Sequence, residues 1–222
     1  MPDGVSWYSS LWTYLQFTWR DVIQLAIDHS VIVIISVLIS TVIGVGLGVL
    51  TYRTDRPREL VLGVTGTFLT IPSLALFTLL IQIPMLGLGA PSVIVALAMY
   101  GLLPIVRNTI VGLREVDPAI VESAQGMGMG RAARLWRIEL PLAWPVVLTG
   151  LRVSTLLLIG IAAIGAYING PGLGELIFGA SIGSAVALNE VLAGTLGVII
   201  LAVLFDLVYV VIFRLTTSKG IR

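Results

Sequence analysis

The chain has no cysteine and a single histidine, His29, among its 222 residues. Disulfides, thiolate metal sites and cysteine nucleophiles are therefore excluded, and one histidine does not make a metal cluster. Lysine is nearly absent too, since Lys219 is the only one. Because the GxxxxGK[ST] loop that cradles ATP phosphates requires a lysine, we do not expect this chain to hydrolyse ATP by that route. We expect neither a catalytic residue nor a bound cofactor or metal in it.

Charge is scarce as well: 11% of the residues are charged, whereas 57% are hydrophobic. This composition is too apolar for a water-soluble domain and indicates an integral membrane protein with an all-α fold. Five apolar stretches are predicted to cross the membrane and to form a single domain. They cover residues 31–50, 60–83, 92–106, 146–168 and 191–213. Pro72 is expected to kink the second span, and Arg107 to close the third.

A further helix is predicted at residues 7–28, where apolar residues recur at helical spacing but polar residues interrupt the run too often for a span. We expect residues 1–29 to form an amphipathic segment at the membrane interface. Tryptophan is favoured at that depth, and Trp7, Trp12 and Trp19 all lie in this segment. A simple anchoring role is the interpretation we favour for it.

The distribution of arginine and lysine predicts the orientation of the spans. Five spans place the two termini on opposite sides of the membrane. With the amino terminus outside, every basic residue except Arg20 lies on the cytoplasmic side or near that end of a span, in agreement with the positive-inside rule. Residues 215–222 are then a cytoplasmic tail. A sixth span, formed by residues 7–28 or 178–188, would break this assignment.

One long polar stretch, residues 116–145, interrupts the apolar sequence. Asp117 and Pro118 are a helix start, because a carboxylate can accept an orphan backbone N–H and proline fits the first helical position. This helix should end in the series Gly126, Gly128 and Gly130, which permits a turn. A second short helix is expected from residue 131 to residue 140, with three arginines on one ridge (Arg131, Arg134 and Arg137) and an end at Pro141 and Pro145.

The residues of this stretch match a known pattern. Glu122-Ser123-Ala124, then Gly128, then Ile138-x-Leu140-Pro141 resembles the EAA loop of the membrane-spanning subunits of bacterial ABC importers, with Ser123 where the family usually has alanine. The resemblance implies a transmembrane type-1 domain at residues 30–214 in the bacterial plasma membrane, with residues 116–141 as a cytoplasmic loop that seats in a partner ATPase. The coupling residues it implies are Glu122, Ser123, Ala124, Gly128, Leu135, Ile138, Leu140 and Pro141.

Other motifs narrow the resemblance. The stretches IPSLA at 71–75, LLPIVRNT at 102–109, ESAQGMG at 122–128 and NGPGLG at 169–174 are similar to permeases of glycine betaine, carnitine, choline and proline importers. The family implies osmoprotectant uptake with an ATPase, a second permease subunit and an extracytoplasmic binding protein as partners, the ATP and magnesium being bound by the ATPase. Methionine-importer permeases share the five-span plan and part of LPIVRNT, so they remain an alternative.

The residues themselves give little support for a quaternary ammonium substrate, which aromatic cages bind through cation–π attraction. The aromatic residues considered for such a cage are scattered and are interpreted as packing residues: Phe68, Phe77, Tyr100 and Tyr167. The family is expected to carry its cage on the binding protein.

Two ionisable residues are expected at membrane depth, Arg152 and Asp206, where charge is costly and is therefore a functional candidate. They are placed to pair, either as an ion pair that fixes helix register or as a gate element of the path. Other classes stay open: a proton-coupled secondary transporter that uses Asp206 or His29, which would leave the EAA-like loop unexplained, and a purely structural membrane subunit.

Overall fold

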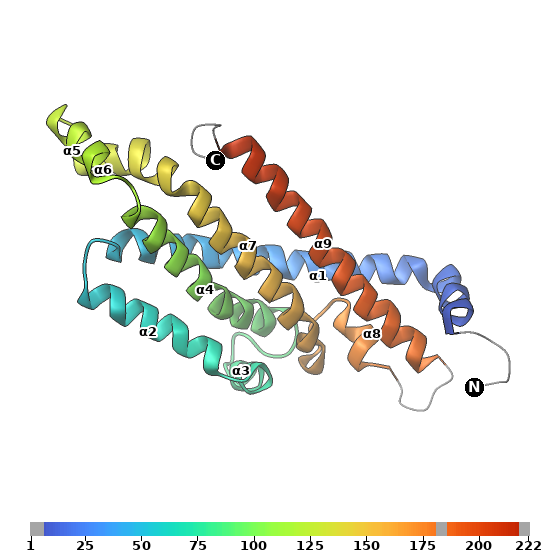
Figure 1. The fold of residues 1–222 in the computed structure, drawn as a ribbon. Helices are drawn as coiled ribbons and strands as arrows, with labels where there is room; N and C mark the ends of the chain where they lie inside the picture. The colour runs from blue at the N-terminus through green and yellow to red at the C-terminus, as the bar shows by residue number, and fades with distance from the viewer. Residues whose placement is uncertain (1–6, 181–185, 218–222) are drawn as a thin grey trace. The chain divides into compact units, whose positions relative to one another are not determined.

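The computed structural model describes residues 7–180 and 186–217, which form helices joined by turns and, within these ranges, no β-strand (Figure 1). The α-helices are α1 (Trp7–Thr51), α2 (Arg56–Thr70), α3 (Ser73–Leu80), α4 (Ala90–Arg114), α5 (Pro118–Gly126), α6 (Arg131–Arg134), α7 (Leu140–Ile164), α8 (Gly174–Phe178) and α9 (Ala187–Thr216). A π-helical turn, η1 (Leu135–Glu139), joins α6 to α7, and a 3-10 turn, η2 (Gly165–Ile168), follows α7. The all-α prediction is confirmed.

Within residues 7–180 and 186–217, four helical stretches are long and apolar enough to cross a membrane, and α2 with α3 would make a fifth. The four are Trp7–Thr51, Ala90–Arg114, Arg131–Ile168 and Ala187–Thr216. Four of the five predicted spans lie within these stretches, and the second covers most of α2, all of α3 and the residues between and after them. Residues 181–185 of the stretch considered for a sixth span lie outside the described residues, as do Lys219, Arg222 and most of the predicted tail.

The second predicted span is broken rather than kinked at Pro72. Helix α2 ends at Thr70, and Pro72, with φ −57° and ψ 134°, immediately precedes α3. Proline lacks a backbone N–H and disfavours the helical conformation of the residue before it, so Ile71 and Pro72 stay outside both helices. The third predicted span also differs, because α4 continues past the exposed Arg107 to Arg114.

The predicted boundary between an interfacial helix and the first span is absent, since α1 runs unbroken from Trp7 to Thr51. No glycine or proline interrupts residues 20–43, and the Gln24 amide donates to Asp28 at 3.0 Å along the helix. Near its beginning Leu11 is buried, and the Asn189 amide of α9 donates to the Ser10 hydroxyl at 2.8 Å. The interfacial position of this part of α1 remains a prediction.

The helices divide between two compact units. Unit 2 comprises the described residues of 37–70, 99–154 and 206–217 and contains α2, α5 and α6 whole. Its core holds Ile105, Leu113, Val116, Ala143, Val147 and Leu151. In this unit Gly44 and Gly48 of α1 face α4, because a Cβ on either glycine would lie 2.9 Å from Ile105 or 2.6 Å from Thr109. The Gly-x-x-x-Gly spacing thus permits close helix approach.

Unit 1 comprises the described residues of 7–36, 71–98 and 155–205, among them α3, η2 and α8. The 3-10 turn η2 contacts both α3 and α8. His29 is fully buried here, with its Nε2 3.0 Å from the Ile159 carbonyl oxygen. The turn at Gly172 packs directly on it, because a Cβ on that glycine would lie 2.8 Å from His29 Nδ1.

Candidate functional site

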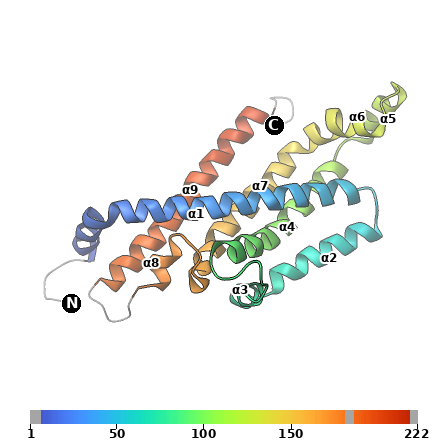
Figure 2. The same cartoon turned by 180° about the vertical axis from the view of Figure 1, so that it is seen from behind.

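The polar stretch begins as its sequence predicts. The Asp117 carboxylate accepts a hydrogen bond from the Ala119 N–H at 2.8 Å, and Pro118 opens α5. This helix ends at Gly126. The chain then turns at Gly128, whose φ of +83° favours glycine although open space surrounds its Cβ position. Both views show α5 and α6 next to each other beyond the C-terminal end of α4 (Figures 1 and 2).

The second half of the stretch differs from the prediction, because Pro141 and Pro145 do not end the helix. Residues Arg131–Ile168 form one continuous helical stretch through α6, η1, α7 and η2. The proline ring normally clashes with the carbonyl four residues earlier, and for Pro141 that residue is Arg137, inside the π turn. The wider turn, in which the Leu140 N–H bonds the Leu135 carbonyl, accommodates the proline without a break.

Most of α5 is exposed, and only one narrow side faces the chain. Ala124 is 1% exposed and Val121 packs on the core of unit 2, whereas Glu122 and Ser123 point to solvent. Of the other predicted coupling residues, Leu135, Ile138 and Leu140 are half-buried, and Gly128 and Pro141 are exposed. Three large apolar side chains of residues 116–145 are exposed as well: Ile120 43%, Met127 73% and Trp136 71%. A nine-residue helix with so little internal packing and so much exposed apolar surface fits a contact with another protein.

A buried carboxylate, Glu139, holds this region together and was not predicted. Its Oε1 accepts from Arg134 Nε and from Arg53 Nη2, both at 2.8 Å. Its Oε2 accepts from the Tyr52 hydroxyl at 2.7 Å and from Arg53 Nη2 at 3.1 Å. The Arg134 Nη1 also donates to Gln125 Oε1 at 3.2 Å. We call these five residues the Glu139 cluster; it joins α5, α6 and the turn after α1.

The buried carboxylate of the cluster is paired with two arginines. The Glu139 and Arg134 side chains are 2% and 5% exposed, while Arg53 reaches solvent at 42%. A buried charge without a partner is strongly destabilising, so the two arginines are what allow a carboxylate at this position. Burial and the neighbouring carboxylate raise the pKa of Tyr52 to about 12, so its hydroxyl stays protonated and donates at physiological pH. Arg134 is accordingly no part of an exposed basic ridge, and only Arg131 and Arg137 are exposed.

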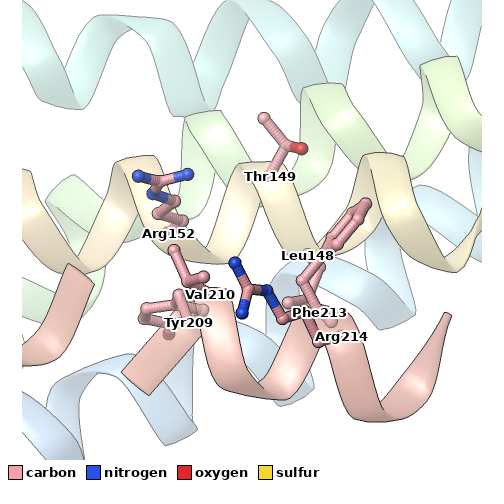
Figure 3. Close-up of a pocket in the computed structure, with 7 residues that line it drawn as sticks. All are labelled: Leu148, Thr149, Arg152, Tyr209, Val210, Phe213 and Arg214. Carbon is pink, nitrogen blue, oxygen red and sulfur yellow. The ribbon is translucent and has the colours of Figure 1, made fainter. Parts of the chain in front are cut away.

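The second pair lies on α7 and α9. Arg152 Nε and Nη2 donate to the two carboxylate oxygens of Asp206 at 2.6 and 2.7 Å, so the structure brings the two predicted residues together. Their side chains remain 45% and 31% exposed. Beside them a cavity of about 200 Å³ is lined by Leu148, Thr149, Arg152, Tyr209, Val210, Phe213 and Arg214 (Figure 3). Within the described residues, no group of three His, Asp or Glu side chains is placed to hold a metal ion.

Comparison with known proteins shows the family to which the chain belongs. Residues 40–218 match the family described as "Binding-protein-dependent transport system inner membrane component". The chain is 37% identical over 210 residues to the choline transport system permease protein OpuBB of Bacillus subtilis (strain 168), covering 94% of each chain. It is 36% identical to the glycine betaine/carnitine/choline transport system permease protein OpuCB of the same organism, over 96% of this chain and 97% of that one.

Further similarity extends to another bacterium and to solved structures. The osmoprotectant import permease protein OsmW of Salmonella typhimurium (strain LT2) is 38% identical over 90% of this chain and 93% of its own length. Two inward-facing crystal forms of the MetNI methionine ABC transporter superpose with TM-scores of 0.80 and 0.77, at 21% and 22% identity. They cover 89% and 90% of this chain and 96% and 98% of the solved chains. At that identity the structures show a shared fold alone.

Proposed function

The chain belongs to the family of binding-protein-dependent transport system inner membrane components, and on this premise we propose that it is the permease subunit of an ATP-driven importer of quaternary-amine osmoprotectants. The observation that carries the substrate class is the similarity, over nearly the whole length, to permeases for choline, glycine betaine and carnitine. The shared fold with a methionine transporter does not favour methionine as the substrate, because the relatives of higher identity are named as permeases for choline, glycine betaine and carnitine.

The exposed side of α5 is the proposed contact with a partner ATPase. Glu122 and Ser123 would meet the ATPase together with the exposed Ile120, Met127 and Trp136. Ala124 packs inward and keeps α5 close to the chain, and Gly128 makes the turn. The Glu139 cluster fastens this loop to the end of α1, so a push on α5 would reach the membrane helices through fixed ion pairs rather than through a loose linker.

The Arg152–Asp206 pair supports a second permease subunit or a water-filled path beside α7 and α9. Charged side chains within a span avoid lipid and face protein or water. Since both side chains are substantially exposed in the single chain, something other than this chain must surround them in the membrane. A second copy or a homologous permease, enclosing a path fed by a binding protein from outside, meets this requirement. ATP-driven closure of the ATPases would then alternate the opening of that path.

Uptake measurements test the substrate class. Cells with and without this chain, each carrying its ATPase and binding protein, are given radiolabelled choline, glycine betaine, carnitine or methionine. We expect ATP-dependent uptake of one or more of the three quaternary amines and none of methionine. Uptake that collapses with an uncoupler while ATP is maintained would support a proton-coupled carrier, and methionine uptake alone would overturn the substrate assignment.

Cysteine labelling tests the orientation, for which a chain without cysteine needs no prior editing. We expect Ser123→Cys to react with a membrane-impermeant maleimide only after the cells are opened. Met85→Cys is the matched control, because Met85 is 93% exposed and lies in the predicted extracytoplasmic turn. Reaction of Ser123→Cys in intact cells would place the loop on the wrong side for an ATPase.

An ATPase assay of the reconstituted complex tests the coupling role. Glu122→Arg reverses an exposed charge on α5, and Gly128→Val introduces a β-branched residue where φ is +83°. We expect both variants to insert normally but to lose substrate-stimulated ATP hydrolysis by about tenfold or more. Glu115→Ala, an exposed change just before α5, is the control and should leave turnover unchanged. Wild-type coupled turnover in both variants would rule out the proposed coupling through α5.

A further inference from the structure

A cavity in unit 1 carries the chemistry that a quaternary ammonium ion requires. It has a volume of about 600 Å³, within the usual range for small-molecule sites. Its lining residues are Ala166, Tyr167, Asn169, Glu175, Phe178 and Gly179. They combine two aromatic rings, one carboxylate and one amide, with no lysine or arginine among them. None of these residues was predicted to form a site, and Tyr167 was interpreted as a packing residue.

The local backbone brings the two rings together from positions eleven residues apart. The 3-10 turn η2 carries Tyr167, and Asn169, with φ +58°, reverses the chain. Helix α8, which ends at Phe178, lies directly against the end of α7. This close approach requires glycine at position 174, because a Cβ there would clash with the Ala163 carbonyl oxygen. As a result the Tyr167 and Phe178 rings lie 4.8 Å apart between centroids and are tilted by 42°.

The rings touch each other but do not bury each other. Tyr167 is 59% exposed and Phe178 is 41% exposed, whereas Tyr100 and Phe77, also aromatic, are 2% and 0% exposed and act as packing residues. Glu175 is exposed in the same cavity. Residues 169–190 contain two glutamates and no lysine or arginine, so the surrounding segment favours cations.

We propose that this aromatic and acidic cavity is a second recognition site for the transported cation, on the permease itself. The proposal rests on the proposed function. An ammonium whose hydrogens are all replaced by alkyl groups donates no N–H bond, so aromatic faces and a nearby carboxylate are the groups that select it over a neutral molecule of the same shape. The Tyr167 and Phe178 rings would contact the methylated head and Glu175 would balance its charge. The predicted topology places the site on the extracytoplasmic side, where cargo leaves the binding protein.

The test measures equilibrium binding of radiolabelled choline to the purified complex without binding protein. We expect weak binding that tetramethylammonium displaces and that 3,3-dimethyl-1-butanol, the neutral isostere of choline, does not. Tyr167→Leu and Phe178→Leu should each weaken binding about tenfold, and Glu175→Gln a few-fold. Tyr167→Phe keeps the ring and should bind as the wild type does. Phe17→Leu, which removes an exposed ring elsewhere in unit 1, is the matched control.

Several results would overturn the proposal. Equal displacement by the neutral isostere would mean an apolar pocket, and equal binding by Tyr167→Leu and Tyr167→Phe would mean that the ring is an interfacial anchor only. Absence of choline binding by a wild-type complex that takes up choline would remove the site but leave the transport function intact. Failure of uptake itself would instead remove the proposed function. Weaker docking of the binding protein to Tyr167→Leu, with choline binding unchanged, would assign the cavity to that partner.

Discussion

Two of the arginine–carboxylate groups in unit 2 differ in almost every respect. The Glu139 cluster surrounds one buried carboxylate with donors from Tyr52, Arg53 and Arg134. The Arg152–Asp206 pair is a single fork of two bonds with both side chains partly exposed. Within this chain the Glu139 carboxylate is enclosed, whereas the Asp206 carboxylate is partly exposed. We propose that the first group holds the fold and that the second serves an interface or a path.

The largest expected effect follows from removing the buried carboxylate. Glu139→Ala would leave Arg134 buried without its partner, a loss of about 3 to 5 kcal/mol of stability. We expect little assembled complex, measured by purification yield and thermal unfolding. The double variant Arg134→Met with Glu139→Met should recover much of the loss, because it removes both buried charges. Glu115→Ala, an exposed carboxylate of the same unit, is the control. Normal stability of Glu139→Ala would contradict the proposal that the Glu139 cluster stabilises the fold.

An intermediate effect is expected from the exposed pair, and on a different readout. Asp206→Asn should give near-normal amounts of complex but several-fold lower uptake, because the pair is formed on the surface of this chain. The charge-exchanged variant Arg152→Asp with Asp206→Arg should regain part of the uptake. Loss of assembly in Asp206→Asn would instead show that the pair fixes helix register.

The smallest effect concerns Tyr52 and pH. Its pKa of about 12 in the folded chain exceeds the value of about 10 expected after unfolding. Its contribution is therefore complete below pH 10 and is lost as the pH rises from about 10 towards 12. Tyr52→Phe should cost about 1 kcal/mol at pH 8 and should flatten the alkaline loss of thermal stability between pH 9 and 11. Parallel pH profiles for the two proteins would contradict this assignment.

The sequence was informative wherever one residue type decides a local structure. Apolar runs predicted the spans, Asp117 and Pro118 predicted the start of α5, and Gly128 predicted the turn. The continuous α1 was missed because polar residues in its first half suggested a separate environment, whereas helix continuity depends on the absence of breakers. Pro141 was misjudged because a π turn relieves its clash with the Arg137 carbonyl, and the sequence carries no clear signal for that turn.

The Glu139 cluster escaped prediction for a geometric reason. In an α-helix only residues three or four apart are neighbours, so Arg134 and Glu139, five apart, were not paired. Its other donors, Tyr52 and Arg53, are more than 80 positions away, and the charge of Arg53 was explained by membrane topology. The aromatic cavity was missed similarly, because Tyr167 and Phe178 meet only through the reversal at Asn169.

The π turn also affects how α6 is positioned relative to α7. It amounts to one inserted residue within a helical stretch of 38 residues, and each residue advances an α-helix by about 100°. The π turn accommodates that residue locally, because residues five apart lie on the same side of a π turn, and this brings Arg134 to Glu139. A regular α-helix over the same residues would place the two about 140° apart around the axis and would separate them. The π turn thus fixes the side of the helical stretch on which α6 is held.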